Sequence, residues 1–257
     1  MKYRELKEVS SFLAEYAACL LGSGVHTSRT ERNTKRIGLS LGTDVHLNLS
    51  MKTMTLTVRN IETGESITEV IDVPHKPIKF FLNSELSALS WEVHDRSLNI
   101  DETKQRYDEI LLRSNRQPFW VAWLLISLSN ACFCRLFEGD YLSMLIVAIA
   151  TAMGFYTRHF VVKKQINLYI AITLAATVSS GMAVLGGHIL PTLTSATAVA
   201  TSVLYLIPGV PLINGIIDIV EGHTLSGVSR LIQGGLIVLS ISSGMAITLL
   251  LTTGSVS

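Results

Sequence analysis

Charged residues divide this chain into two parts that are suited to different environments. Residues 1–117 contain 16 Lys and Arg and 16 Asp and Glu, whereas residues 118–257 contain only five and four. A long stretch with so few charges is typical of helices that cross a lipid bilayer. We therefore predict an α-helical membrane protein, with an α+β domain over residues 1–112 and a transmembrane domain over residues 113–257.

The bulk composition excludes several classes of protein. The formal net charge is +1, so the chain lacks the basic excess that a nucleic-acid partner requires. Its three cysteines have no metal-ligand spacing, and the sequence predicts neither a metal nor a cofactor. The first apolar run, residues 12–21, is interrupted by Glu15 and does not resemble a signal peptide. We expect the first domain to stay in the cytoplasm.

The first domain alternates between helical and strand patterns. Residues 9–21 repeat apolar side chains at helical spacing, and Ser28 with Glu31 has the spacing of a capping box at the start of a second helix. Residues 45–51, 56–58 and 67–73 alternate apolar and polar side chains, which predicts three strands. Two further helices are expected, and Asn99 with Glu102 caps the last one.

The second domain contains five apolar stretches that approach the length needed to cross a bilayer. They cover residues 118–134, 141–157, 166–187, 193–219 and 228–251. If these spans alternate in direction, six of the seven flanking cations fall on one side, which predicts a cytoplasmic N-terminus and an external C-terminus. The six are Arg113, Arg116, Arg158, Lys163, Lys164 and Arg230, and Arg135 is the exception.

The fourth apolar stretch is broken. It reads VLYLIPGVPLINGIIDIVEG over residues 203–222, where Pro208, Gly209 and Pro211 interrupt the helical pattern. Backbone groups freed by such a break must be satisfied by protein or water, and a broken helix is a common way to build a transporter site. Pro211 suits the first turn of a new helix, whose free N–H groups favour an anion.

Two polar residues follow the break on one helix face. Asn214 and Asp218 are four residues apart, so they point to the same side. An acid inside a membrane is costly, which makes Asp218 a candidate for proton coupling or substrate gating. The alternative is a structural acid near the cytoplasmic interface that pairs with Arg230.

A second candidate motif lies in the first domain, where Gly24, Thr27, Arg29 and Glu31 form a G-x-x-T-x-R-x-E run. One interpretation is that these residues cap and solvate the start of a helix. The other is that they bind a ligand or the membrane domain. The sequence does not decide between the two.

These motifs together resemble those of the bacterial threonine/serine exporter family, in particular the N-terminal component of its split, two-gene members. The resemblance covers almost the whole chain. It is strongest in the run PGVPLINGIIDIVEGHTLSGVSRL and extends to GSGVHTSRTE and to the helices before the membrane. The run matches the family's proline-glycine motif, its aspartate and its G-x-x-R at Pro208, Gly209, Pro211, Asn214, Asp218, Gly227 and Arg230. One departure is Glu138, where the family has a second glycine.

The resemblance implies a function in export. Split members work with a separate small membrane subunit, are associated with succinate and related C4-dicarboxylates, and belong to a family associated with threonine and serine. We therefore expect one component of a secondary exporter in the bacterial inner membrane, which could form a higher oligomer. Residues 208–218 and Arg230 would line the pathway, while residues 24–31 would gate or sense it from the cytoplasm.

Two rival hypotheses belong to other classes of protein. A membrane-tethered hydrolase would carry its active site in the first domain, near His26, and would not need Asp218. A non-catalytic scaffold would only stabilise a partner channel and would tolerate every polar substitution within the membrane. The polar break inside an apolar stretch favours transport over both.

Overall fold

The computed structural model describes residues 3–50, 52–74, 78–114 and 118–253. Internal contacts divide the chain into two compact units. The first unit contains residues 1–116 together with residues 210–232, and the second contains residues 117–209 and 233–257. These two units differ from the ranges 1–112 and 113–257 that the sequence suggested, because residues 210–232 pack with the N-terminal part of the chain. Arg116, which was counted for the orientation, lies outside the described residues.

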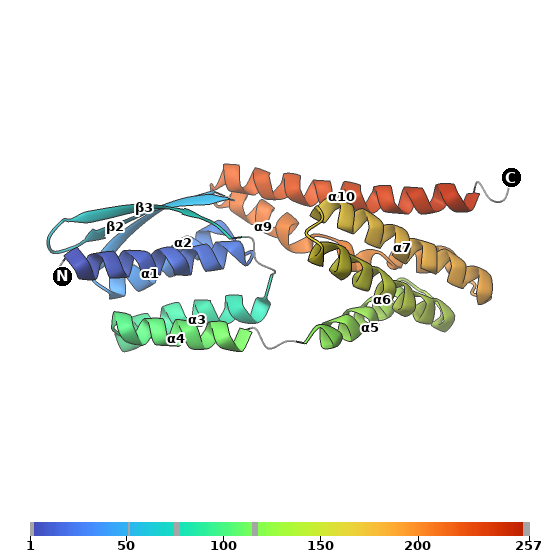
Figure 1. The fold of residues 1–257 in the computed structure, drawn as a ribbon, viewed down its shortest axis with the longest axis horizontal. Coiled ribbons are helices and arrows are strands. Elements are labelled where there is room, and N and C mark those ends of the chain that lie inside the picture. The colour runs from blue at the N-terminus through green and yellow to red at the C-terminus, as the bar shows by residue number, and fades with distance from the viewer. Residues whose placement is uncertain (1–2, 51, 75–77, 115–117, 254–257) are drawn as a thin grey trace. The chain divides into compact units, whose positions relative to one another are not determined.

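The first unit combines helices with a small antiparallel sheet, in three layers (Figure 1). Helices α1 and α2 lie between the sheet and the helical pair α3–α4. The elements are α1 (Tyr3–Gly22), α2 (Thr27–Ser40), β1 (Thr43–Leu49), β2 (Thr53–Asn60), β3 (Ser66–Asp72), α3 (Phe80–Arg96) and α4 (Ile100–Ser114). The expected order of two helices, three strands and two helices is confirmed.

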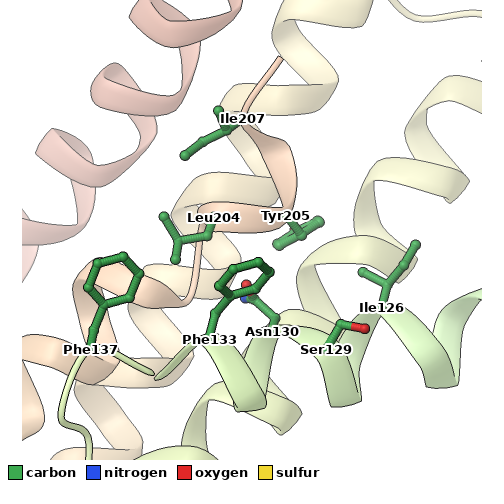
Figure 2. A pocket seen from close by; sticks show the side chains of 8 residues that line it. All are labelled: Ile126, Ser129, Asn130, Phe133, Phe137, Leu204, Tyr205 and Ile207. Atoms are coloured by element: carbon green, nitrogen blue, oxygen red, sulfur yellow. The ribbon is translucent and has the colours of Figure 1, made fainter. Parts of the chain in front are cut away.

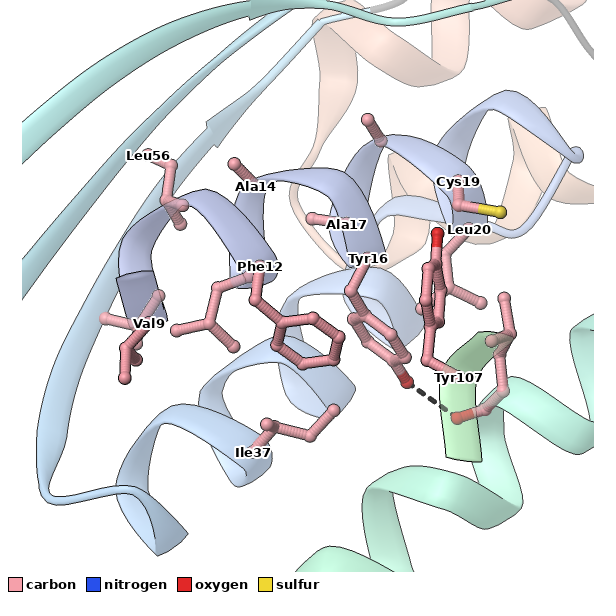
Figure 3. Packing of buried hydrophobic residues seen from close by; sticks show 14 of the residues in the cluster. Val9, Phe12, Ala14, Tyr16, Ala17, Cys19, Leu20, Ile37, Leu56 and Tyr107 are labelled. Carbon is pink, nitrogen blue, oxygen red and sulfur yellow. Dashed lines mark hydrogen bonds between the residues drawn. The ribbon is translucent and has the colours of Figure 1, made fainter. Parts of the chain in front are cut away.

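The core of the first unit forms around α1, whose apolar residues repeat at helical spacing and are almost all buried. Tyr16 is fully buried and donates its hydroxyl to the carbonyl of Leu86 at 2.7 Å, which ties α1 to α3 (Figure 3). The ring of Phe12 meets Tyr107 of α4 edge to face at 5.6 Å. These aromatic contacts hold the helical layers together.

The three strands form a meander in the order β1-β2-β3. Val45 pairs with Val58 and Leu47 pairs with Leu56, so the apolar residues of β1 and β2 share one face. That face packs on α1 and α2. Because only one face of these strands is buried, apolar and polar residues alternate in the sequence.

Helix capping confirms one expectation and corrects another. At α4, the Glu102 carboxylate accepts the Asn99 backbone N–H at 3.0 Å, and the Asn99 side chain accepts the Glu102 backbone N–H at 2.9 Å, which is the predicted capping box. The capping box expected from Ser28 is wrong, because α2 begins at Thr27. His26 is its N-cap and accepts the Arg29 backbone N–H.

The second unit is helical and contains most of the apolar sequence (Figure 1). Its elements are α5 (Phe119–Leu136), α6 (Tyr141–Lys163), α7 (Leu168–Ile189), the short α8 (Ser195–Thr201), the 3-10 turn η1 (Leu204–Leu206) and α10 (Thr224–Thr253) from Gln233 onward. The remaining helix, α9 (Gly209–Val220), belongs to the first unit from Val210 onward.

Among the described residues, four helices are long and apolar enough to cross a membrane: α5, α6, α7 and α10. A fifth crossing results if α8, η1 and α9 count as one broken span. The predicted break is therefore confirmed at Ile207 and Pro208, which separate η1 from α9. Arg158 was expected in a loop, but α6 continues past it to Lys163 because the apolar pattern resumes after Arg158.

Small residues bring the helices of the second unit into close contact. A Cβ on Gly154 of α6 would lie 1.9 Å from Ser179 Oγ and 2.3 Å from the Tyr205 hydroxyl. A Cβ on Gly244 of α10 would lie 2.5 Å from the carbonyl oxygen of Thr173 in α7. The small residues of the third and fifth apolar stretches thus serve packing within the unit.

Candidate functional site

Asp218 is the centre of a buried polar cluster in the first unit. It lies in the last turn of α9 and is fully buried. One carboxylate oxygen accepts the backbone N–H of Thr27 at 2.8 Å, and the other accepts the Thr27 hydroxyl at 3.0 Å. Asp218 therefore caps the N-terminus of α2, where the positive end of the helix dipole stabilises a carboxylate.

Arg230 of α10 supplies the counter-charge. Its Nε lies 2.9 Å from Asp218 Oδ2, and the side chain is only 4% exposed. The Nε–H is not aligned for a hydrogen bond, so this contact is an ion pair, whereas Nη2 donates to the carbonyl of Val25 at 2.9 Å. A buried pair of this kind depends on both partners, because either charge left alone would be desolvated.

Asn214 makes a third link between α9 and the start of α2. Its amide donates to the carbonyl of Gly24 at 2.6 Å, one helical turn before Asp218. Gly24 adopts a φ of +86°, which favours glycine, and an added Cβ would lie 2.9 Å from Ile78. The shared face predicted for Asn214 and Asp218 is thus the face that packs on residues 24–27.

A ring of less buried titratable side chains surrounds these contacts. His26 Nδ1 lies 3.4 Å from Glu221, whose other carboxylate oxygen lies 3.6 Å from Arg32. His223 lies 3.6 Å from Glu31. Burial lowers the pKa of His26, and a hydrogen bond from Ser28 lowers the pKa of the Glu221 carboxyl. His26 is therefore neutral and Glu221 ionised at neutral pH.

The cluster is held on a tight helical hairpin formed by α9 and the start of α10. Gly222 turns the chain with a φ of +90°, and the His223 N–H donates to the carbonyl of Asp218 at 2.7 Å. Gly215 and Gly227 let the two helices touch, since a Cβ on Gly227 would lie 2.6 Å from the carbonyl oxygen of Gly215. Asp218 and Arg230 are thereby brought face to face.

The two motifs found in the sequence are therefore in direct contact. We call residues 24–31 the first motif and residues 210–230 the hairpin motif. Contacts between them link Thr27 with Asp218, Gly24 with Asn214, and Glu31 with His223. Pro208 and Gly209 precede the hairpin motif and belong to the second unit, while Pro211 lies in the first turn of α9.

Some residues of the cluster were not predicted from the sequence. Val25 takes part through its backbone carbonyl, which no side-chain pattern reveals. Glu221 and His223 were given no role from the sequence, and His26 was considered only for the rival hydrolase. The acidic and basic residues of the two motifs have opposite charges, and this pattern could have indicated that they pair.

A cavity of about 490 Å³ lies beside the cluster in the first unit. Its walls come from the start of α2, the first turns of α3 and the first turns of α9. Arg29 and His26 supply its basic groups, and Phe80, Val210 and Ile213 contribute apolar walls.

The second unit has its own cavity, of about 440 Å³, next to the helix break (Figure 2). Phe133 of α5, and Phe137 directly after this helix, face Leu204, Tyr205 and Ile207 across it. The wall is mostly apolar. The amide of Asn130 at its base donates to Thr151 at 2.6 Å and to the carbonyl of Thr201 at 3.0 Å. This cavity offers a carboxylate no cation.

The described parts of the two units show no site typical of a metalloenzyme. Among the residues that the structure describes, no group of three His, Cys, Asp or Glu side chains is close enough to hold a metal ion.

Comparison with known proteins decides the family. The family model described as "Putative threonine/serine exporter" matches residues 11–252. The chain belongs to the threonine/serine exporter family. It is thus a multi-pass membrane protein of a transporter family, and not an enzyme. The resemblance that the sequence motifs indicated is confirmed.

Two curated relatives of this family member are both named "Probable succinate transporter subunit YjjP". The protein from Klebsiella aerogenes is 28% identical over 250 residues, which cover 95% of this chain and 94% of the relative. The protein from Escherichia coli strain K12 is 28% identical over 255 residues, which cover 97% and 96%. No solved structure gives a significant match.

Proposed function

We propose that this chain is one component of a two-subunit secondary exporter that moves a small carboxylate metabolite out of the cell. The substrate would be a C4-dicarboxylate such as succinate, or threonine and serine. The observation that carries the proposal is the buried cluster around Asp218, in which the two motifs of an exporter-family chain meet. The names of the two relatives support a succinate substrate and a partner subunit.

The proposal places the protein in the bacterial inner membrane, with residues 1–112 in the cytoplasm, residues 113–257 forming the transmembrane domain and the C-terminus outside. The excess of positive charge on one side of the spans supports this orientation. Because residues 210–232 pack with the N-terminal part of the chain, we propose that the hairpin motif also belongs to the cytoplasmic side.

In this proposal, the break and the hairpin motif form the moving part of the pathway. Pro208, Gly209 and Pro211 interrupt the backbone, while Asn214 and the Asp218–Arg230 pair connect α9 and α10 to the first motif. Gly24, Thr27, Arg29 and Glu31 would then sense or gate substrate, because each is held against, or lies beside, a residue of the hairpin motif or its cavity.

The partner would be a small membrane subunit with several spans, which completes the transport pathway within the bilayer. The word "subunit" in the names of both relatives supports such a partner.

Metabolite export tests this function directly. Extracellular succinate, threonine and serine are measured for cells that make the chain with and without the small membrane subunit. We expect one metabolite to rise only when both proteins are present. If no metabolite changes in either case, the exporter assignment is wrong.

Substitutions at the buried ion pair test the role of Asp218. We expect Asp218→Asn to insert into the membrane but to abolish gradient-driven export. It also leaves Arg230 without its counter-charge, which costs about 3–5 kcal/mol of stability. The double variant Asp218→Asn/Arg230→Gln removes both charges and should regain much of that stability.

Export by the double variant separates transport from folding. If the Asp218 carboxylate takes part in transport, the double variant is stable but inactive. Export at the wild-type rate, by either Asp218→Asn or the double variant, would show that Asp218 has only a structural role.

A further inference from the structure

The cavity beside the cluster has the size of a small-molecule site. Its volume of about 490 Å³ falls within the range of roughly 300–1,000 Å³ that is usual for ligand pockets. Three elements that are far apart in the sequence contribute to its wall: the first turn of α2, the first turns of α3 and the first turns of α9. A bound molecule would therefore touch both the first motif and the hairpin motif.

Arg29 gives this cavity an unbalanced positive charge. Its Nε donates to the Ser87 hydroxyl at 3.0 Å, and its two terminal amino groups make no hydrogen bond with any described residue. No acid of the described chain lies within ion-pair distance of it. The other basic groups of the cluster all face acids: Arg230 faces Asp218, His26 and Arg32 face Glu221, and His223 faces Glu31.

The remaining wall contains both polar and apolar side chains. His26, Asn83, Ser84 and Asn214 are polar, while Phe80 and Ile213 are apolar. Because His26 Nδ1 accepts the Arg29 backbone N–H, the proton of its neutral ring is on Nε2, which makes that nitrogen a donor. Asn83 is 8% exposed, and its Oδ1 has no hydrogen-bond partner among the described residues.

We propose that this cavity is a binding site for a small aliphatic carboxylate, whose carboxylate group pairs with the terminal amino groups of Arg29. A guanidinium presents its donors in a planar fork that matches a carboxylate, and a partly buried pair of this kind is strong. The short carbon chain of the ligand contacts the apolar residues of the cavity wall. The ligand class rests on the proposed export function, but binding can be measured on the protein alone.

Ligand binding to the purified full-length chain in detergent tests this site. Isothermal titration calorimetry with succinate, L-threonine and L-serine should give saturable binding for at least one of them. We expect Arg29→Gln to weaken it by tenfold or more and Arg29→Lys to weaken it less. Ser84→Trp, at an exposed position in the wall, should block binding by filling the cavity without removing a charge.

Arg32→Gln is the matched control. It lies on the same helix, its side chain is 59% exposed, and it does not line the cavity, so binding should be unchanged. The site is disproved if the wild-type chain binds none of the three compounds, if Arg29→Gln binds as well as wild type, or if sulfate binds as well as the carboxylates.

Measurement of export from cells alongside binding separates this inference from the proposed function. Export without binding to the purified chain would disprove the carboxylate site and leave the exporter assignment intact. Binding that depends on Arg29 without any export would support the site and contradict the exporter assignment.

Discussion

The buried carboxylate of Asp218 is paired with groups from two other elements. The backbone and hydroxyl of Thr27 donate to it from α2, and Arg230 balances its charge from α10. Removal of either partner would leave part of this buried carboxylate unsatisfied, which is costly in the protein interior.

His26 makes stability depend on pH. Its pKa is lowered by burial, so between the folded value and the ordinary value of about 6.5 only the unfolded chain takes up this proton. Its contribution to stability is complete above about pH 6.5 and is lost as the pH falls toward the folded pKa. We expect the thermal unfolding temperature to fall between about pH 7.5 and pH 5.5.

His26→Asn isolates this contribution. An asparagine can still cap α2 but does not titrate, so the unfolding temperature of the variant should fall less over the same pH range. An identical pH dependence in both proteins would show that His26 is not the titrating group.

At the scale of elements, the hairpin motif depends on close contact between α9 and α10. Gly227 lies where a Cβ would meet Ile219 at 2.5 Å and the carbonyl oxygen of Gly215 at 2.6 Å. We expect Gly227→Ala to force α9 away from α10 and to cost about 1–3 kcal/mol of stability.

Gly235→Ala, on the same helix, is the control. A Cβ there has no atom within 4 Å, so the variant should be as stable as wild type or gain up to about 1 kcal/mol from helix propensity. Equal losses from both variants, measured by chemical unfolding in detergent, would contradict the close contact.

The end of α5 contains the one departure from the family pattern that the sequence indicated. Glu138 adopts a φ of +63°, and the Gly139 N–H donates to the carbonyl of Cys134 at 2.9 Å, as in a Schellman motif. A left-handed conformation is strained for a residue with a Cβ. Glu138→Gly should therefore raise stability by about 1 kcal/mol, whereas Glu138→Ala should not. A loss of stability in Glu138→Gly would contradict this account.

The elements could be predicted largely because their signals are local. Apolar periodicity identified α1, the strands and the apolar helices, and the Asn99–Glu102 spacing identified the cap of α4. The N-cap of α2 was missed because histidine is an unusual capping residue, while Ser28 offered a more typical pattern. The break at Pro208 was predicted because proline removes a backbone donor from any helix.

The site was predicted only in pieces. Asn214 and Asp218 were placed on one face, and the pairing of Asp218 with Arg230 was one of two alternatives. Their contact with the first motif joins residues about 190 positions apart, and no local pattern reports such a contact. The unpaired charge of Arg29 likewise became visible only once the partners of the other basic residues were known.

At the scale of the whole molecule, the chain alternates between its two units. It leaves the first unit after α4, forms the second, returns to the first at α9 and ends in the second through α10. The hairpin motif contains the start of α10, and the same helix ends in the second unit. In our proposal this shared helix couples the first motif to the transport pathway.

The central claim is that the two motifs form one buried cluster, and a double-mutant cycle tests it most directly. The unfolding free energy in detergent is measured for wild type, Thr27→Val, Asp218→Asn and the double variant. Because the two side chains are in direct contact, we predict a coupling energy of about 1–3 kcal/mol, so that the double variant loses less than the sum of the two losses. Losses that simply add would contradict the cluster.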